Sequence, residues 1–477
     1  MNTRLIAGVT LALILAGCAT PPAIDASALP QVPAAFKESP SPLGEGRGEG
    51  QLRFRLVSAV PPDGRWWTVF GDPVLDDLVH RADERNTSIQ VAAARLLQAR
   101  ALLQQSNADR LPQVGVAAGV QRGDGLTVTN LPPGHPQTFY TAGANVSWEA
   151  DLFGKLRRAS EAASYDAQAR EALLRNTRLV IEADVAQAYL ALRALDEERR
   201  IVRQTVDAFR GTLDLTQRRY RAGDVAELDV ARATTQVAAT EADALALDRQ
   251  RAQLEHAIAV LVGEMPSGFS IAEAPLNAAL PGIPAGLPAD VLARRPDVAA
   301  AQASMLAAQA RVGVAQAAWF PDISLTGAGG LASTAASELF KYSARAWSVG
   351  LLASLPIFDG GRREAGVRFA SGDMDAAVAQ YREQVLVAVR DVEDQLSSLR
   401  LLERQAEAQD RAVRAASRAT ALSDRRWREG LVSQLDLLDA QRSELADRRA
   451  AVEVKGAQYQ ATVGLVRALG GGWEVKS

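Results

Sequence analysis

The sequence has 477 residues with 53 Lys or Arg and 56 Asp or Glu, so its formal net charge is only −3. This balance excludes the basic surface by which proteins bind nucleic acid, so we expect no nucleic-acid partner. A single Cys excludes a disulfide framework, and the three His residues lack the spacing of metal ligands, so we expect no metal site.

The N-terminal segment has the features of a lipoprotein signal peptide. Arg4 precedes an apolar stretch of about a dozen residues, which is too short to span a bilayer. The stretch ends in Leu15-Ala16-Gly17-Cys18, which is similar to a bacterial lipobox. We expect cleavage before Cys18 and attachment of S-diacylglycerol and an N-acyl chain such as palmitate, because several acyl chains anchor a protein stably. The alternative is a Cys that falls by coincidence in an ordinary signal peptide.

The two halves of the chain share a pattern of residues. Gly223 is followed by Leu228-Asp229-Val230, and Gly430 by Leu435-Asp436-Leu437, at an offset of 207 positions. Upstream, Leu111-Pro112-Gln113-Val114 matches Phe320-Pro321-Asp322-Ile323 at an offset of 209. The shared order and the near-constant offset predict a tandem structural repeat, which two unrelated helical stretches of similar composition would not produce.

Each repeat is predicted to contain the same elements in the same order: a helical stretch, two short strands, a very long helix, a turn at Gly and a returning helix. The expected helices are 72–110, 155–221 and 224–262, then 288–319, 362–428 and 431–469. The expected strands are 113–121, 138–149, 322–331 and 346–355. A helix of about 67 residues reaches on the order of 100 Å, so it needs packing along its whole length.

The long helix 155–221 carries apolar residues at heptad spacing, including Ile181, Val185, Leu192 and Val202. A second stripe of smaller residues runs beside this seam. Two stripes predict a helix that contacts neighbours on both sides, as in a cylinder of helices. The remaining face carries Glu, Arg, Gln and Asp, and we expect it to face water.

The four predicted strands cannot close a sheet on their own. No apolar run of 18 residues follows Cys18, so any further membrane crossing must be made by strands closed into a barrel. Within each strand the polarity contrast is weak, because small residues dominate. Open edges are not tolerated in hydrocarbon, so several copies must pool their strands, and three copies would supply twelve. The strands alone do not choose three copies over two or four.

Several motifs resemble those of the outer membrane factor family, and the resemblance covers about 66–470. The type most similar is the OprM/NodT group of lipoproteins that serve RND efflux systems, with TolC as a more distant relative. The segments that carry the resemblance are Trp66 to Leu75, Leu287 to Val298, Ala318 to Leu325, Phe358 to Arg362 and Arg426 to Arg442.

The resemblance implies a mainly α fold with a transmembrane β-barrel. Three copies would form a 12-stranded barrel across the bacterial outer membrane and a 12-helix α-barrel in the periplasm. The implied partners are two further copies of the chain, a periplasmic membrane fusion (adaptor) protein, an inner-membrane RND pump and outer-membrane lipid. The implied function is the passive exit duct of a tripartite efflux system.

We expect six segments along the chain. These are a signal peptide at 1–17, a lipid-anchored segment at 18–65, a first repeat at 66–265, a linker at 266–286 in a belt around the tunnel, a second repeat at 287–470 and a tail at 471–477.

The resemblance also places a gate at the periplasmic tip. The positions that match the family's gate are Leu435, Asp436, Asp439 and Arg442. Asp439 and Arg442 are three residues apart on a helix and can share a face, so closure would combine ion pairs with a Leu435 constriction. The alternative is an ordinary exposed pair that stabilises the helix by less than about 1 kcal/mol. The tip loops at Gly223-Asp224 and Gly430-Leu431 are the expected adaptor contacts.

Three other functions fit the sequence less well. An enzyme is disfavoured, because the chain has no metal-ligand cluster and Gly327 to Gly330 lacks the Lys of a phosphate-binding loop. A type I secretion duct is an alternative within the same fold, which the lipobox and the motif at 287–298 disfavour. A structural coiled-coil lipoprotein is an alternative of a different class, and it would have no use for paired strands. The cargo is left open among antibiotics, solvents, metals and siderophores.

Overall fold

The computed structural model describes residues 23–24, 29–30, 33–38, 55–56, 64–123, 136–276, 278, 280–283 and 288–472. The expected signal peptide, Cys18 and most of the C-terminal tail lie outside the described residues. Among the helices within these ranges, none is both long enough and apolar enough to cross a membrane.

The order of elements repeats as predicted. The helices of the first repeat are α2 (Pro73–Arg85), α3 (Thr87–Ala108), α4 (Lys155–Ala222) and α5 (Glu227–Leu261). Those of the second are α6 (Pro288–Arg294), α7 (Pro296–Ala317), α8 (Arg362–Arg428) and α9 (Gln434–Ala468). The main strands are β2 (Gln113–Gly123), β3 (Gln137–Glu149), β5 (Asp322–Ser333) and β6 (Arg345–Ser354), and the two-residue strands β1 (Arg55–Leu56) and β4 (Pro281–Gly282) pair in parallel. Short 3₁₀ turns include η2 (Trp66–Phe70) and η3 (Pro266–Gly268).

The first helical stretch of each repeat is interrupted, which the periodicity did not predict. Asn86 separates α2 from α3, and Arg295 separates α6 from α7. The Asn86 side chain accepts a hydrogen bond from the Ser88 amide (2.9 Å) and so caps α3, while its Nδ2 donates to the carbonyl of Leu261 (2.8 Å). The break therefore joins α2 and α3 to the end of α5.

The chain divides into two compact units. One unit comprises Met1–Pro30, Ala94–Glu171 and Ala300–Glu383 and holds the four long strands. The other comprises Gln31–Ala93, Ala172–Ala299 and Gln384–Ser477 and holds most of the length of the helical hairpins. We call them the sheet unit and the helical unit.

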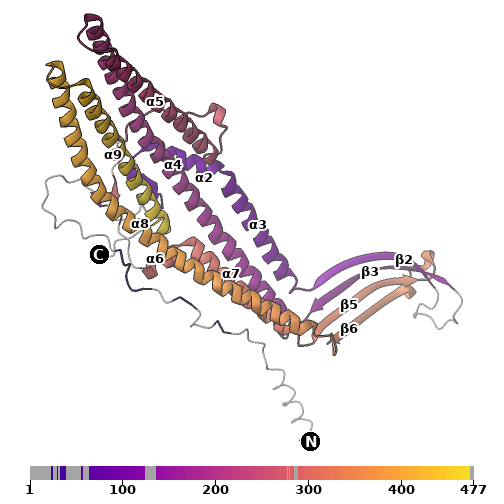
Figure 1. Ribbon diagram of the computed structural model, residues 1–477. Coiled ribbons are helices and arrows are strands. Elements are labelled where there is room, and N and C mark those ends of the chain that lie inside the picture. The colour runs from indigo at the N-terminus through magenta and orange to yellow at the C-terminus, as the bar shows by residue number, and fades with distance from the viewer. Residues whose placement is uncertain are drawn as a thin grey trace. The chain divides into compact units, whose positions relative to one another are not determined.

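In the sheet unit, the strands form an antiparallel sheet in the order β2-β3-β5-β6 (Figure 1). The hairpin of one repeat thus pairs with the hairpin of the other through β3 and β5. Gly143 lies opposite Gly330 in this pairing, and a Cβ atom on Gly143 would lie 2.8 Å from the carbonyl oxygen of Gly329. The central strands approach closely because neither residue has a side chain.

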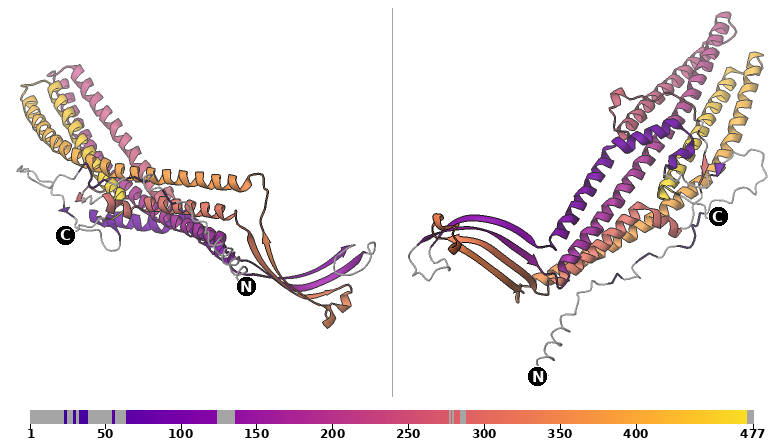
Figure 2. Two further views of the ribbon diagram at one scale, coloured as in Figure 1. Left: turned by 90° about the horizontal axis from the view of Figure 1, so that it is seen from below. Right: turned by 180° about the vertical axis from the view of Figure 1, so that it is seen from behind.

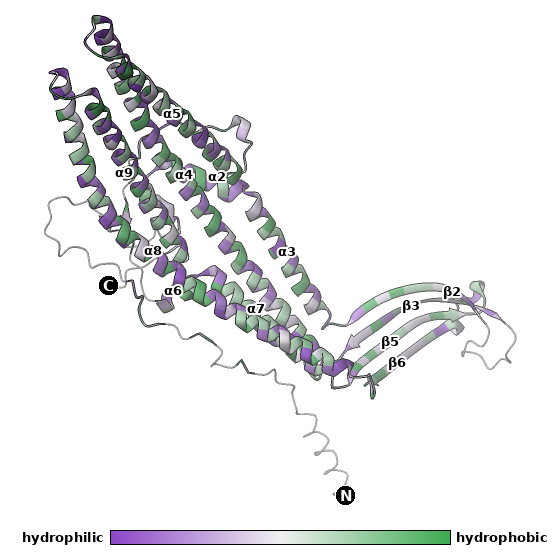
Figure 3. Ribbon diagram, viewed as in Figure 1, coloured by the Kyte–Doolittle hydropathy of each residue, from purple (hydrophilic) through white to green (hydrophobic). Residues whose placement is uncertain are grey.

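In the helical unit, the hairpins α4–α5 and α8–α9 lie side by side, as the views in Figures 1 and 2 agree. The predicted heptad seam of α4 is confirmed, since Val185, Leu192 and Val202 are fully buried. Val185 and Leu192 belong to the larger core, whose largest fully buried side chains include Trp66, Leu75, Leu78, Tyr189, Leu190, Ile258, Tyr459 and Leu465. Val202 belongs to a smaller cluster with Leu195, Ile201, Leu247 and Leu445. Apolar and polar residues alternate along α4 and α8 and do not form an apolar run (Figure 3).

Candidate functional site

The helices α4 and α8 end in the same turn. Gly223 and Gly430 have φ angles of +85° and +74°, a region that favours glycine. At both turns the Gly amide donates to the carbonyl three residues earlier (3.0 Å), and the next amide donates to the carbonyl five residues earlier (2.9 and 2.8 Å). This pattern closes a helix and reverses the chain. The tip loops at Gly223-Asp224 and Gly430-Leu431 are therefore built identically in the two repeats.

Arg219 joins the two tips, a contact that the sequence did not predict. Its guanidinium lies 4.7 Å from the ring centroid of Trp427, and its Nη2 donates to the carbonyl of Arg428 (3.2 Å). Trp427 is buried. One Arg of the first repeat thus satisfies a free carbonyl at the C-terminus of α8 and covers the last aromatic ring of that helix.

Asp436 and Ser433 cap the N-terminus of α9 reciprocally. The Asp436 amide donates to the Ser433 hydroxyl (3.2 Å), and the Ser433 amide donates to the Asp436 carboxylate (3.0 Å). The hydrogen bond from the Ser433 hydroxyl, followed by the bond from its amide, holds the pKa of Asp436 below the ordinary value. The carboxylate is thus already engaged in starting the helix.

The other expected gate residues have separate surroundings in one chain. Leu435 is 48% exposed. Arg442 donates from Nε to the Gln236 side chain of α5, which is buried. Within the part of the chain that the structure describes, Asp439 is exposed and makes no hydrogen bond or ion pair. Asp439 and Arg442 therefore do not pair inside a single chain, because Arg442 is turned toward α5.

The cross-strand register divides the sheet into two chemically distinct faces. Level with Val114 to Val120, one face carries mostly apolar or small residues, and its polar members are Ser333 of β5 and Arg345 of β6. The apolar and small residues are Val114, Val116, Ala118 and Val120 of β2, Tyr140, Ala142, Ala144 and Val146 of β3, Gly327, Gly329 and Leu331 of β5, and Trp347 and Val349 of β6. The opposite face is mostly polar or small, with Thr141, Asn145, Ser147, Thr326 and Ser348. The contrast in polarity between the two faces is weak along one strand but becomes clear across the four strands.

Both faces and both edges of this sheet are open in one chain. Val116 is 86% and Trp347 81% exposed, although both are large apolar side chains. The outer strands β2 and β6 each pair with a neighbour on one side only. A row of free backbone groups along each edge is a template for pairing with another chain.

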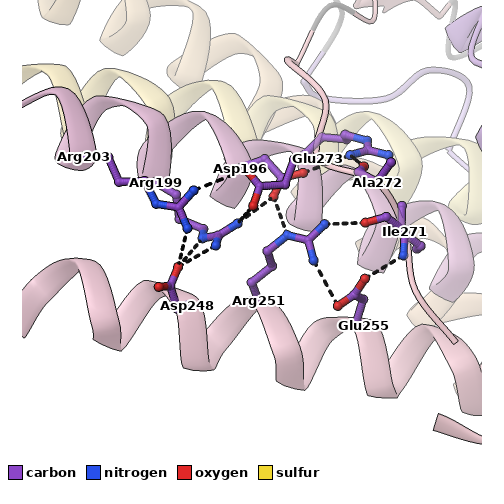
Figure 4. Close-up of polar contacts among 10 residues, drawn as sticks. Asp196, Arg199, Arg203, Asp248, Arg251, Glu255, Ile271, Ala272 and Glu273 are labelled. Carbon is purple, nitrogen blue, oxygen red and sulfur yellow. Dashed lines mark hydrogen bonds and ion pairs between the residues drawn. The ribbon is translucent and has the colours of Figure 1, made fainter. Parts of the chain in front are cut away.

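The helical unit contains a charge cluster centred on the buried carboxylate of Asp196 (Figure 4). Its carboxylate accepts hydrogen bonds from Arg251 (2.7 Å) and Arg193 (2.9 Å), and Arg199 lies 3.5 Å away. The members of this arginine cluster are Arg193, Asp196, Arg199 and Arg203 of α4, Asp248, Arg251 and Glu255 of α5, and Glu273 of the following linker. The sequence predicted that the polar face of the long helix meets water, and that prediction was wrong for Arg193, Asp196 and Arg199, because α5 and the linker cover them.

Glu182 of α4 is a half-buried carboxyl that accepts a hydrogen bond from Nε1 of the Trp66 side chain (2.9 Å). Burial raises its pKa to about 7, and the nearby Asp83 carboxylate adds to the shift, while Trp66 and Arg178 oppose it. Within the described ranges, no group of three or more His, Cys, Asp or Glu is placed to hold a metal ion.

A tandem repeat of helical hairpins and paired strands, with open sheet edges, defines a channel of the TolC-like class. The family model described as outer membrane efflux protein matches residues 78–264 and 287–471. The chain therefore belongs to the outer membrane efflux protein family, as the motifs predicted.

Relatives and solved structures agree with this assignment. The pyoverdine export outer membrane protein OpmQ of Pseudomonas aeruginosa is 33% identical over 447 residues, which cover 91% of this chain and 94% of that protein. The solvent efflux pump outer membrane protein SrpC of Pseudomonas putida is 32% identical, with 97% of both chains covered. The structure of the outer-membrane channel OprN matches with a TM-score of 0.86 at 33% identity, covering 96% of this chain and all of that one. The VceC structure from Vibrio cholerae matches with a TM-score of 0.81 at 30% identity, covering 87% of this chain.

The function follows from the family. The protein is an outer-membrane channel of efflux pumps that extends into the periplasm, and it is not an enzyme.

Proposed function

We propose that this chain is the exit duct of a tripartite RND-type efflux system, a passive homotrimer gated at its periplasmic tip. The observation that carries the proposal is the four-stranded sheet, which has one apolar face, one polar face and two free edges. Such a sheet is stable across a bilayer only when its edges are paired and its apolar face meets lipid.

The strand directions support closure between copies. Neighbouring strands of the sheet are antiparallel throughout, so β2 and β6 run in opposite directions. The β6 edge of one copy can therefore continue the antiparallel pattern with the β2 edge of the next. Three copies would close twelve strands into a barrel with its polar face toward the lumen, which is within the size range of outer-membrane barrels.

The gate is proposed to form between copies. Asp439 has no partner within its own described chain, and Leu435 is half exposed beside it. Around a threefold axis, Asp439 carboxylates would repel each other unless Arg442 of another copy or a cation lay between them. Arg442 would then leave Gln236, while Asp436 would keep the start of α9 fixed. The loops at Gly223-Asp224 and Gly430-Leu431 would contact the periplasmic adaptor protein.

We further propose that Cys18 carries the lipid anchor and that the chain divides into the six segments expected from its sequence. The anchor predicts that palmitate is incorporated by the full-length chain in cells. A Cys18→Ser chain that labels as strongly as the wild type would contradict it. Cargo selection is assigned to the inner-membrane pump, since a wide polar lumen offers no enclosed binding pocket.

Single-channel conductance in planar bilayers tests the duct and the gate together. The test variant is Asp439→Ala with Arg442→Ala. The control is Asp214→Ala with Arg218→Ala, an exposed pair on α4 that lies four residues apart. We expect mostly closed wild-type and control channels, and open channels in the test variant. Equal conductance in all three proteins would refute the gating role of Asp439 and Arg442 but would still support a duct. If the wild-type, control and test proteins all assembled correctly and none conducted ions, a structural envelope lipoprotein would be favoured.

A further inference from the structure

The carboxylate of Asp196 is paired with three guanidinium groups in a buried place. Arg193, Asp196, Arg199 and Arg251 are each at most 9% exposed, which is rare for charged residues. Removing one partner from a buried ionic group leaves the others uncompensated, so such a group resists separation of the segments that carry it. The arginine cluster therefore fixes α4 against α5 at this level.

The same arginines hold the linker by its backbone. Arg251 donates from Nη2 to the carbonyl of Ile271 (2.6 Å), and Arg193 donates to the carbonyl of Ala272 (2.8 Å). The Ile271 amide donates in turn to the Glu255 carboxylate (2.6 Å). Figure 4 shows the linker backbone running past these groups. The linker is therefore held by backbone atoms as well as by the Glu273 side chain.

A further contact extends from the cluster to α2. The Arg193 guanidinium lies 4.7 Å from the ring centroid of Tyr189, one turn earlier on α4. The Tyr189 hydroxyl donates to Asp72 (2.6 Å), which caps the N-terminus of α2. Four segments, α2, α4, α5 and the linker, are thus joined by one set of polar contacts.

The second repeat lacks this cluster. At the offset of 207, Arg193, Asp196 and Arg251 correspond to Arg400, Glu403 and Gln458. Glu403 is exposed, and Gln458 donates weakly to the carbonyl of Leu402 (3.5 Å). Arg400 does hold a non-helical segment, through an ion pair with Glu38 (2.6 Å). The α8–α9 hairpin also contacts the linker, through Lys455 with the carbonyl of Leu276 (3.1 Å) and Tyr459 with the carbonyl of Ala278. Within the described residues, these are separate contacts, whereas α4–α5 has a network around a buried carboxylate at this level.

We propose that the arginine cluster is the fixed point of gating in the first repeat. It makes α4, α5 and the linker one rigid body at the level of Asp196. Movement of the α4–α5 hairpin during opening is confined to the portion between the cluster and the tip, about 203–222 and 227–248. Asp196 is a positioning residue for the gate and touches no cargo. This inference rests on the proposed gated duct.

The test compares Asp196→Asn with Glu403→Gln in the full-length chain. Both changes remove one carboxylate at equivalent positions of the two repeats, but only the first removes the ion-pair partner of a buried arginine, Arg193. Arg199 and Arg251 lose one of their carboxylate contacts and keep the others. We expect closed-state conductance to rise roughly tenfold in Asp196→Asn, within the range of ordinary coupling between sites, and to stay at the wild-type level in Glu403→Gln. Hydrogen exchange at the Ile271 amide should accelerate in the first variant only.

A second variant covers the case in which Asp196→Asn does not assemble. Arg251→Lys keeps the charge but loses the forked contact that reaches the carbonyl of Ile271. We expect faster exchange at Ile271 and a smaller rise in conductance, roughly threefold, intermediate between the wild type and the tenfold case. Faster exchange with wild-type conductance, in either variant, would overturn the proposal and leave the cluster a purely structural one. Failure of the proposed duct can be told apart from failure of this proposal, because the double variant of Asp439 and Arg442 would then also show no conductance.

Discussion

The two units of this chain differ in what they need in order to be stable. The helical unit buries its apolar residues within one chain, so that Leu192 and Ile258 are fully covered. The sheet unit leaves Val116 and Trp347 more than four-fifths exposed, although its strands are fully paired inside the sheet. One unit therefore carries its own core, while the other has the backbone order of a finished structure and depends on lipid and further copies for burial.

The largest expected effect is in the helical core. Leu192→Ala removes a fully buried side chain, so we expect it to lower the free energy of unfolding of the helical unit by about 2–5 kcal/mol. Val116→Ala, on an exposed strand, should change it by less than about 0.5 kcal/mol. Hydrogen exchange resolved by peptide during denaturation measures this. Equal losses for both variants would mean that the two units do not differ as described.

We expect a pH dependence of stability in the helical unit. Folding raises the pKa of Glu182 from its ordinary 4.5 to about 7, so the folded chain binds the proton more tightly than the unfolded chain. This contribution to stability is complete below pH 4.5 and is lost as the pH rises through about 7. We expect Glu182→Gln to be more stable than the wild type at pH 8, by up to about 3 kcal/mol. Urea unfolding at pH 5 and pH 8 measures the difference, and a variant that gains equally at both would show that the carboxyl charge is not the cause.

In the sheet, we expect stability to depend on the close approach of strands at glycine residues more than on exposed apolar side chains. A Cβ atom at Gly330 would lie 2.5 Å from the Gly143 Cα across β3, whereas Gly327 on the same strand has open space beside it. We expect Gly330→Ala to weaken the β3–β5 pairing by about 1–3 kcal/mol and Gly327→Ala to have little effect. The readout is the fraction of heat-resistant oligomer on a gel. The helical unit should have the wild-type melting temperature in both glycine variants. If the helices unfolded together with the sheet in Gly330→Ala, the two units would not be independent.

The smallest expected effect is at the tip. Arg219→Ala removes the cover of Trp427 and a hydrogen bond to the end of α8. We expect a local loss of about 1 kcal/mol, seen as faster hydrogen exchange over the last turn of α8 with an unchanged global melt. Arg426→Ala, at the equivalent position of the second repeat, serves as the control. Acceleration that spread to the sheet strands would contradict a local role.

The sequence predicted the parts of the fold that depend on periodicity, and less of what depends on contacts between distant segments. The offset between Gly223 and Gly430 was enough to predict the repeat and its turns, because glycine at a positive φ leaves a local signal. The break at Asn86 was missed, since its cause is a contact with Leu261 far along the chain. The arginine cluster was missed for the same reason: Asp196 and Arg199 look like a solvated face until α5 and the linker cover them.

The candidate gate was located by resemblance and not by pattern. Asp439 and Arg442 have helical spacing that fits a surface pair equally well, and in one chain Arg442 bonds Gln236 instead. The two faces of the sheet were only faintly visible in the sequence, because Gly and Ala occupy many positions of each strand. Cross-strand register made them clear, and register is set by pairings between residues about 180 positions apart, such as Gly143 with Gly330.

The number of copies in the assembled channel tests the central claim most directly. Native mass spectrometry of the full-length protein, extracted from outer membranes in mild detergent, counts the chains in each particle. Three chains per particle are predicted, since three four-stranded sheets close a twelve-stranded barrel. A population of stable single chains, with the apolar face and both edges of the sheet left open, would contradict the account.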